Sequence, residues 1–195
     1  MDEPYELVQD GDLEQGDFIR DLSVYIQDSP ENYATPQPGF DHFPLAIILS
    51  QSCDLQPQRG QEFALVCPVY TVDQLYTSWG GDRLGSRWDE ARKGNSINYH
   101  PLPACSKAGH EREAAMVEFP RVFEMKIDRL RGLCDQAAPW LRLKTPYREQ
   151  MAQQFAVKIM RIGLPVRVPE WSEIGPGVRA RAEATASEQQ PVQGS

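Results

Sequence analysis

The sequence predicts an α+β protein rich in β-strands, and three kinds of segment in its 195 residues support this class. Residues 43–50 form a short unbroken apolar run, which is typical of a strand buried on both faces. Segments 18–26 and 62–70 contain β-branched and aromatic residues, as strands do. Residues 146–162 have the period of an amphipathic helix. We therefore expect one sheet covered by a C-terminal helix.

The N-terminal half begins with residues 1–12, which have the composition of a polar lead-in. Two loops separate the first three strands, because prolines and glycines gather at 28–41 and at 56–60. Pro68 lies inside the third strand. It cannot donate a backbone hydrogen bond, so it indicates a bulge or a sheet edge.

The middle of the chain is expected to hold short elements. Residues 72–94 combine scattered apolar residues with charges and glycines, which predicts one or two short helices and a final glycine cap. The prolines in 98–103 favour an extended segment, since each one disfavours helix at the residue before it. After a charged surface loop at 105–113, alternating apolar residues predict two further strands, at 115–119 and 122–127.

The C-terminal helix at 146–162 has the clearest boundaries. Thr145 can cap it, and Pro146 suits the first helical position. A glycine and a proline follow it and stop it. Every fourth residue is apolar, which forms one stripe for packing on the sheet: Tyr147, Met151, Phe155 and Ile159. We expect a single domain over 13–168, and the composition of 173–195 predicts a disordered tail.

Composition and cysteine usage indicate a bacterial protein of the cytoplasm. No apolar run approaches the roughly 20 residues that span a bilayer, and the first residues are acidic and polar, unlike a secretory signal. The four cysteines form no short-spaced pair, so we expect free thiols, no metal and no cofactor. Cys53, Cys67, His42 and His100 have the chemistry of zinc ligands, but their spacings do not match a typical structural site.

Charge is distributed unevenly along the chain. Residues 1–70 hold 13 acidic and 2 basic residues, a net charge of −11, whereas residues 71–170 hold 16 basic and 12 acidic residues, a net charge of +4. The acidic part repels phosphate backbones, so any RNA-binding surface is expected in the second part. Alternatively the two parts attract each other or a protein partner, which is the interpretation we favour.

Basic residues around the C-terminal helix are the candidates for binding RNA, and Trp140 and Tyr147 lie near them in the sequence. These candidates are Arg142, Lys144, Arg148, Lys158 and Arg161. The alternative is an ordinary solvated helix face, because glutamate and glutamine residues dilute the charge.

Three motifs of the N-terminal part follow one another in an order known from bacterial toxins. Gln15-Gly16-Asp17-Phe18 opens the first strand, the apolar strand runs from Pro44 to Ser50, and the third strand ends at Thr71. In this succession the chain resembles the MazF/PemK family of small RNA-cleaving toxins. The resemblance covers about residues 13–72. It implies an SH3-like barrel, here elaborated with extra strands and the C-terminal helix.

The family's catalysis uses an arginine before the proline of the second strand and a serine or threonine after the third. The matching positions are Phe43 and Thr71. Phe43 cannot stabilise the charge that develops on a phosphate during cleavage. The resemblance therefore implies a catalytically degenerate barrel that acts as a binding or regulatory module in a bacterial stress, toxin–antitoxin or defence system. We expect a protein partner, with RNA and a second copy of the chain as further partners, and no membrane.

Two enzymatic alternatives remain open. The first is an active metal-independent endoribonuclease in which His42, Thr71 or Arg148 takes part, with His42 as general acid or base. The second is a cysteine-dependent enzyme that uses Cys53, which lies beside Asp54 just past the buried strand. A neighbouring carboxylate disfavours a thiolate, so the simpler interpretation is that Cys53 packs in a turn.

Overall fold

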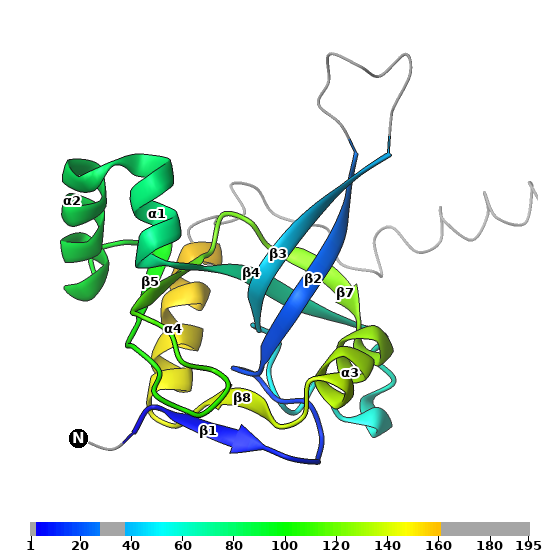
Figure 1. Ribbon diagram of the computed structural model, residues 1–195. Helices are drawn as coiled ribbons and strands as arrows, with labels where there is room; N and C mark the ends of the chain where they lie inside the picture. Colours follow the sequence, from blue (N-terminus) through cyan, green and yellow to red (C-terminus); the bar gives the residue numbers. More distant parts are fainter. Residues whose placement is uncertain (1–2, 28–37, 161–195) are drawn as a thin grey trace, which may run out of the picture. The chain divides into compact units, whose positions relative to one another are not determined.

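The computed structural model of the protein describes residues 3–27 and 38–160, and the account below concerns these residues (Figure 1). The strands are β1 (Tyr5–Val8), β2 (Phe18–Gln27), β3 (Pro38–Ile48), β4 (Phe63–Thr71), β5 (Tyr99–Leu102), β6 (Ala115–Glu118), β7 (Phe123–Lys126) and β8 (Trp140–Leu143). The helices are α1 (Val72–Trp79), α2 (Gly81–Arg92), α3 (Ile127–Gln136) and α4 (Tyr147–Ile159), with a 3₁₀ turn at Pro57–Arg59. Within this part of the chain, no helix has the length and apolar character that a membrane crossing needs.

The main sheet is antiparallel and has the strand order β2-β3-β4-β6-β5, and β7 also pairs with β4. β1 and β8 form a separate two-stranded sheet. The strands predicted at 18–26, 43–50 and 62–70 are therefore neighbours in one sheet. The predicted α+β class, with helices and antiparallel sheets, is confirmed.

β4 is the strand that connects the parts of the main sheet. Its segment Phe63–Val66 pairs with β7, its segment Val69–Thr71 pairs with β6, and residues 66–68 pair with β3. Pro68 lies between the segments that pair with β7 and β6, where a residue without an N–H is tolerated. The proline therefore marks a change of strand partner.

The apolar run of β3 is buried on both faces, as its sequence predicts. Ala46 and Ile48 belong to a core cluster to which α3 contributes, whereas Ile47 and Leu49 belong to a second cluster to which α4 contributes. Successive residues of a strand point to opposite faces, so each face of β3 supports a different part of the core. The two helices lie apart from each other, one beside each of these clusters (Figure 1).

α4 begins one residue after the predicted start, and its apolar stripe packs along only part of its length. Met151 is fully buried and Phe155 is half-buried, but Ile159 is 54% exposed. Thr145 is not the N-cap; its hydroxyl donates a hydrogen bond of 2.8 Å to Glu149 instead. The predicted end of the helix at 162, the domain end at 168 and the tail at 173–195 lie outside the described residues.

Three segments differ from their sequence-based expectation. The expected lead-in at 1–12 contains β1, in which Tyr5 is 1% exposed and donates a hydrogen bond of 2.7 Å to the carbonyl of Pro103. β3 begins at Pro38, inside the expected loop 28–41, of which 28–37 lies outside the described residues. α3 was not expected from the sequence. It follows directly on β7, so the short strand pattern at 122–127 runs into a helix.

His100, on β5, is a buried side chain whose protonation can be followed through stability. It is 5% exposed, its Nδ1 lies 2.6 Å from Oε1 of Gln154, and its ring stacks on Phe119. Burial lowers the pKa of His100 below its usual value. As the pH falls below about 6.5, the unfolded chain takes up a proton that the folded chain resists, so the free energy of unfolding decreases.

We expect the free energy of unfolding to fall by up to about 1.4 kcal/mol per pH unit from this residue below about pH 6.5. Urea unfolding of the wild-type protein and of His100→Gln, each at about pH 7 and about pH 5.5, measures the difference. The variant should lose less stability on acidification. An identical loss in both proteins would show that His100 is not the group responsible.

Candidate functional site

A buried ion pair joins the Gly16-Asp17 motif to β8. Asp17 is fully buried, and its carboxylate lies 2.6 Å from Nε and 2.9 Å from Nη2 of Arg142. Gly16 has a φ of +87°, and a Cβ there would lie 3.2 Å from the side chain of Leu143. The motif that resembles the toxin family therefore has a structural role: it ties the start of β2 to β8.

Most of the predicted RNA-binding cations are engaged within the fold. Arg142 is only 8% exposed, and Glu14 accepts hydrogen bonds from both Arg142, at 2.8 Å, and Arg148, at 2.5 Å. Lys158 donates to the side chain of Asn98. Lys144 is half-buried, and Arg161 lies outside the described residues. These side chains do not form an open basic surface in the described part of the chain.

Cys53 lies in the turn that follows β3. Serine hydroxyls of this turn accept hydrogen bonds from backbone amides of neighbouring segments. The Sγ of Cys53 is 3.7 Å from Oε1 of Gln51 and 3.7 Å from Oδ1 of Asp54. In the same segment, Ser50 accepts a hydrogen bond of 2.8 Å from the amide of Leu65. Cys53 is exposed, and no histidine is among the hydrogen-bonding neighbours that the structure gives it. Cys53 therefore lies in a turn, as the simpler interpretation predicts, but the prediction that its side chain packs there is wrong because the side chain is exposed.

His42 and Thr71 are not brought together with Phe43 into one site. His42 is exposed on β3, 3.6 Å from the carboxylate of Asp21. Phe43 is 4% exposed and packs against Phe123 with ring centroids 5.2 Å apart. Thr71 is the N-cap of α1, because its hydroxyl accepts the amide hydrogen of Gln74 at 3.3 Å.

Thr71 does line a small hollow of about 230 Å³ that contains ionisable side chains which sequence reasoning did not bring together. These groups are Arg20, His110, Glu111 and Arg112, and Pro44 lies at the same hollow. His110 lies 2.8 Å from the carbonyl of Pro139, and Arg112 donates at 2.7 Å to the hydroxyl of Tyr5. They come from the loop 105–113 and from β2. In the sequence they look like ordinary surface charges, so no local signal could have found them.

A second hollow, of about 260 Å³, lies between β4, β6 and α1. Its polar walls are Tyr70, Trp79, Glu118 and Arg121. The guanidinium of Arg121 donates at 3.2 Å to the Tyr70 hydroxyl and lies 5.0 Å from the ring centre of Phe43. A guanidinium is therefore present beside position 43, although it comes from the turn between β6 and β7.

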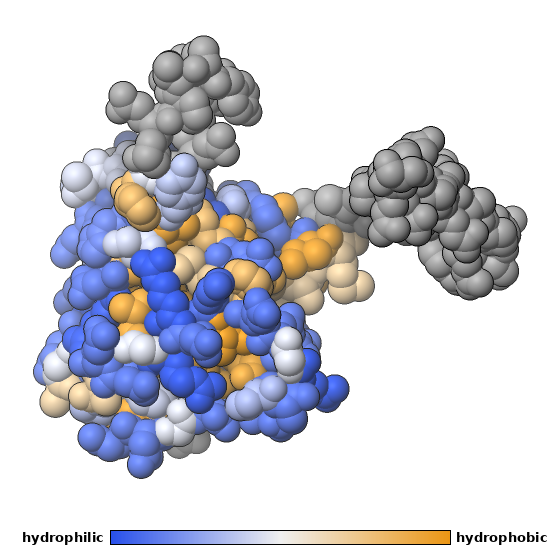
Figure 2. Space-filling model, turned by 90° about the vertical axis from the view of Figure 1, so that its right-hand side faces the viewer, coloured by the Kyte–Doolittle hydropathy of each residue, from blue (hydrophilic) through white to orange (hydrophobic). Residues whose placement is uncertain are grey.

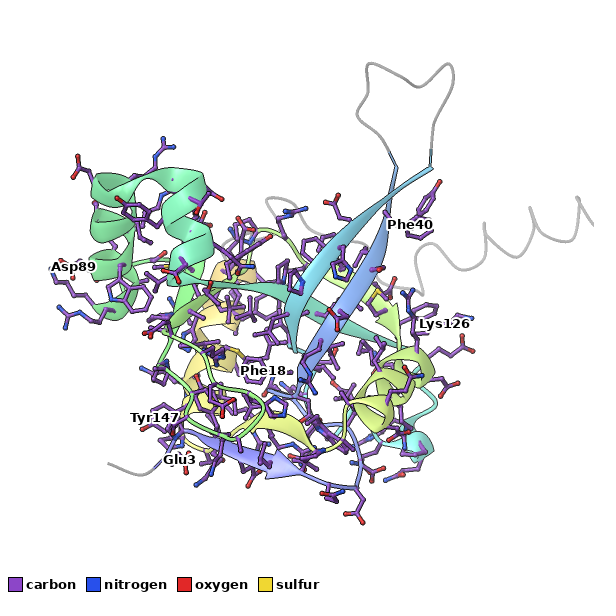
Figure 3. The ribbon with its side chains drawn as sticks, in the orientation of Figure 1. Glu3, Phe18, Phe40, Asp89, Lys126 and Tyr147 are labelled. Carbon is purple, nitrogen blue, oxygen red and sulfur yellow. The ribbon has the colours of Figure 1, made fainter. Side chains whose placement is uncertain are left out.

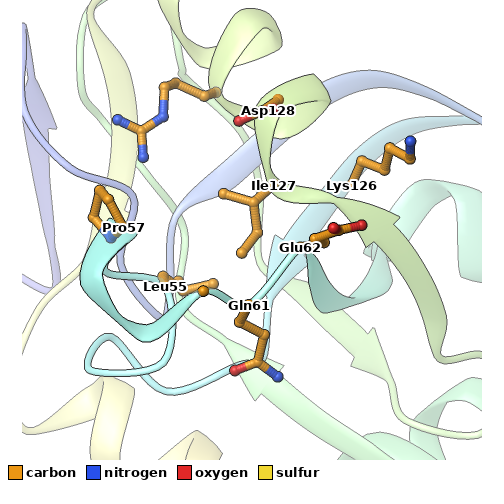
Figure 4. Close-up of a pocket in the computed structure, with 9 residues that line it drawn as sticks. Leu55, Pro57, Gln61, Glu62, Lys126, Ile127 and Asp128 are labelled. Carbon is orange, nitrogen blue, oxygen red and sulfur yellow. The ribbon is translucent and has the colours of Figure 1, made fainter.

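A hollow of about 740 Å³ lies between the 3₁₀ turn and the start of α3 (Figure 4). Its charged residues have both signs: Glu62, Lys126, Asp128 and Arg131. On the face beside α3, hydrophobic residues form small patches separated by hydrophilic ones (Figure 2). The hollow therefore has no surface of a single charge sign, and the face beside α3 has no continuous hydrophobic patch.

No cluster of three or more histidine, cysteine, aspartate or glutamate side chains suited to a metal ion occurs in residues 3–27 and 38–160. No family model matches the chain, and no curated protein matches it.

Proposed function

We propose that the protein is a binding and regulatory module built on an SH3-like barrel of the MazF/PemK type, and that it acts in a bacterial stress, toxin–antitoxin or defence system. The sheet supports this proposal, since β2, β3 and β4 pair in chain order and antiparallel. The observation that carries it is the burial of Phe43 in the core, at the position that matches the family's catalytic arginine.

Metal-independent cleavage of RNA needs a positive group for the charge that develops on the phosphate. Where the toxins have this group, the chain has an apolar ring packed on Phe123, and the guanidinium beside it, from Arg121, donates to Tyr70 and Asp41. At the second matching position, the hydroxyl of Thr71 is used to cap α1. Both side chains contribute to the fold, which suits a module that binds without cleaving.

The outer end of the β2–β3 ribbon is the surface that we propose for a protein partner. Tyr25 is 56% exposed and Phe40 is 68% exposed, and their rings meet edge to face with centroids 5.7 Å apart. Phe40 points away from the ribbon at this end (Figure 3). Exposed aromatic residues are typical anchors of protein interfaces. Because residues 1–70 carry a net charge of −11, we propose that the partner is basic.

The test of this function has two arms. The purified protein is expected to leave mixed RNA intact, as judged by gel electrophoresis. On a column, it is expected to retain a basic protein from a bacterial extract, and the double variant Tyr25→Ser/Phe40→Ser should lose this protein. Tyr76→Ser is the matched control, since it removes a similarly exposed ring (61%) from α1. The proposal would be overturned if the wild-type protein cleaves RNA and Thr71→Ala abolishes this cleavage. It would also be overturned if the double variant still retains the basic protein.

A second candidate, a metal-independent endoribonuclease, is favoured by the hollow at Thr71. That hollow brings an imidazole, from His110, and two guanidinium groups, from Arg20 and Arg112, to one place. An acid or base and a cation are the groups that such cleavage uses. If RNA is cleaved and both Thr71→Ala and His110→Ala abolish cleavage, this second function replaces the first.

A further inference from the structure

We infer that the hollow between β4, β6 and α1 binds a guanine base. Its walls include the ring of Trp79, the carboxylate of Glu118 and the guanidinium of Arg121. The inference goes beyond the proposed function, because such a site could serve a module that binds RNA or nucleotides whether or not the chain cleaves RNA.

The aromatic wall is held in position before any ligand arrives. The guanidinium of Arg87 lies 4.3 Å from the ring centre of Trp79. Tyr99 packs edge-on against the same ring with centroids 5.1 Å apart, and its hydroxyl accepts a hydrogen bond of 3.4 Å from Arg87. A fixed ring loses little freedom when a base stacks on it, and base stacking on aromatic side chains is a general mode of nucleic-acid binding.

The carboxylate of Glu118 is the group that selects the base. It is half-buried, and within the described residues no cation lies at ion-pair distance from it. Burial raises its pKa, while Arg121 and the Tyr70 hydroxyl favour the charged form. A carboxylate can accept two parallel N–H groups. Guanine offers such a pair on its Watson–Crick edge, from N1–H and the 2-amino group, whereas adenine presents an unprotonated N1 there.

Arg121 complements this carboxylate. Its guanidinium is fixed by Tyr70 at 3.2 Å and by Asp41 at 2.7 Å, and a guanidinium has five N–H donors in all, so donors remain for a ligand. Arginine commonly donates to O6 and N7 of guanine. Glu118 and Arg121 together therefore present an acceptor and a donor in the pattern that guanine requires.

The size of the hollow fits one base. Its volume of about 260 Å³ is below the about 300–1,000 Å³ of pockets that hold drug-sized ligands. A guanine base can come from a free nucleotide or from an unpaired position in single-stranded RNA. The recognition chemistry is the same for both sources, so the experiment must distinguish them.

Isothermal titration calorimetry tests the inference with guanosine, inosine and adenosine monophosphates and with two single-stranded uridine-rich RNAs, which carry one guanine or one adenine. We expect guanosine monophosphate to bind at least about tenfold more tightly than adenosine monophosphate. Inosine monophosphate, which lacks the 2-amino group, should bind with intermediate affinity. Tighter binding of the guanine RNA than of the mononucleotide identifies RNA as the source, and the reverse order identifies a free nucleotide.

The variant Glu118→Gln should lose the preference for guanine over adenine while it keeps the wild-type melting temperature within a few degrees. Glu90→Gln is the matched control, because it removes an exposed carboxylate from α2. Equal affinity for the guanine and adenine ligands, no binding of any guanine ligand, or an unchanged preference in a folded Glu118→Gln protein would each overturn the inference.

Discussion

The variant Met151→Asp is expected to be unfolded or at least about 4 kcal/mol less stable than the wild-type protein. Met151 is completely buried in the cluster that β3 and β4 form with α4. An aspartate there would bury a charge among the apolar side chains of this cluster. Circular dichroism and urea unfolding measure the effect.

Ile159→Asp is the matched control for this prediction. Ile159 belongs to the same apolar stripe, two turns later, but it is 54% exposed. Because an exposed aspartate remains hydrated, we expect a change within about 0.5 kcal/mol. If Met151→Asp is as stable as Ile159→Asp, α4 does not pack on the sheet as described.

Arg142→Ala is expected to cost about 3–5 kcal/mol, because it leaves the carboxylate of Asp17 buried and without its cation. Two hydrogen bonds, at 2.6 and 2.9 Å, join the two side chains, and Arg142 also contacts Glu14. The double variant Asp17→Asn/Arg142→Met removes both charges. It should recover part of the lost stability, since no uncompensated charge remains.

Arg131→Ala provides the control for the buried pair. Arg131 lies 3.6 Å from Asp12, and both side chains are at least one-third exposed. Solvent screens such a pair, so its loss should cost no more than about 1 kcal/mol. Urea unfolding of all three variants compares them. Similar losses for Arg142→Ala and Arg131→Ala would contradict the special role of the Asp17–Arg142 pair.

The central strands could be predicted from the sequence because their signals are local. The run in β3 is apolar at every position, which requires burial on both faces, and Ile47 and Ile48 do lie in different core clusters. α4 was predicted for a similar reason, since its stripe and its flanking prolines are all close in sequence.

The pairing of β1 with β8 could not be predicted in the same way. Each strand has four residues, too few for a clear alternation, and Tyr5 pairs with Leu143 from the far end of the domain. α3 was missed because its apolar residues continue directly from those of β7. In both places tertiary contacts decide the local structure.

The candidate site could not be predicted from the sequence, because its residues come from distant parts of the chain. Arg121, Glu118 and Tyr70 are up to 51 positions apart in the chain, and only the pairing of β4 with β6 brings them together. Conversely, Arg142 and Arg148 are basic in the sequence, but in the fold both form ion pairs with Glu14, and Arg142 also pairs with Asp17. The sequence alone does not show which basic side chains form ion pairs within the fold.

The α1–α2 hairpin packs on β6 through a small cluster that consists of Leu75, Leu84, Ala91 and Met116. A cluster of this size opens at lower free energy than the main core. The hairpin supplies Trp79, whereas the sheet supplies Glu118, so a ligand that touches both can bind only when the hairpin is closed. Affinity and hairpin closure are therefore thermodynamically linked: the observed affinity is proportional to the fraction of molecules in which the hairpin is closed, so a substitution far from the ligand weakens binding when it lowers that fraction.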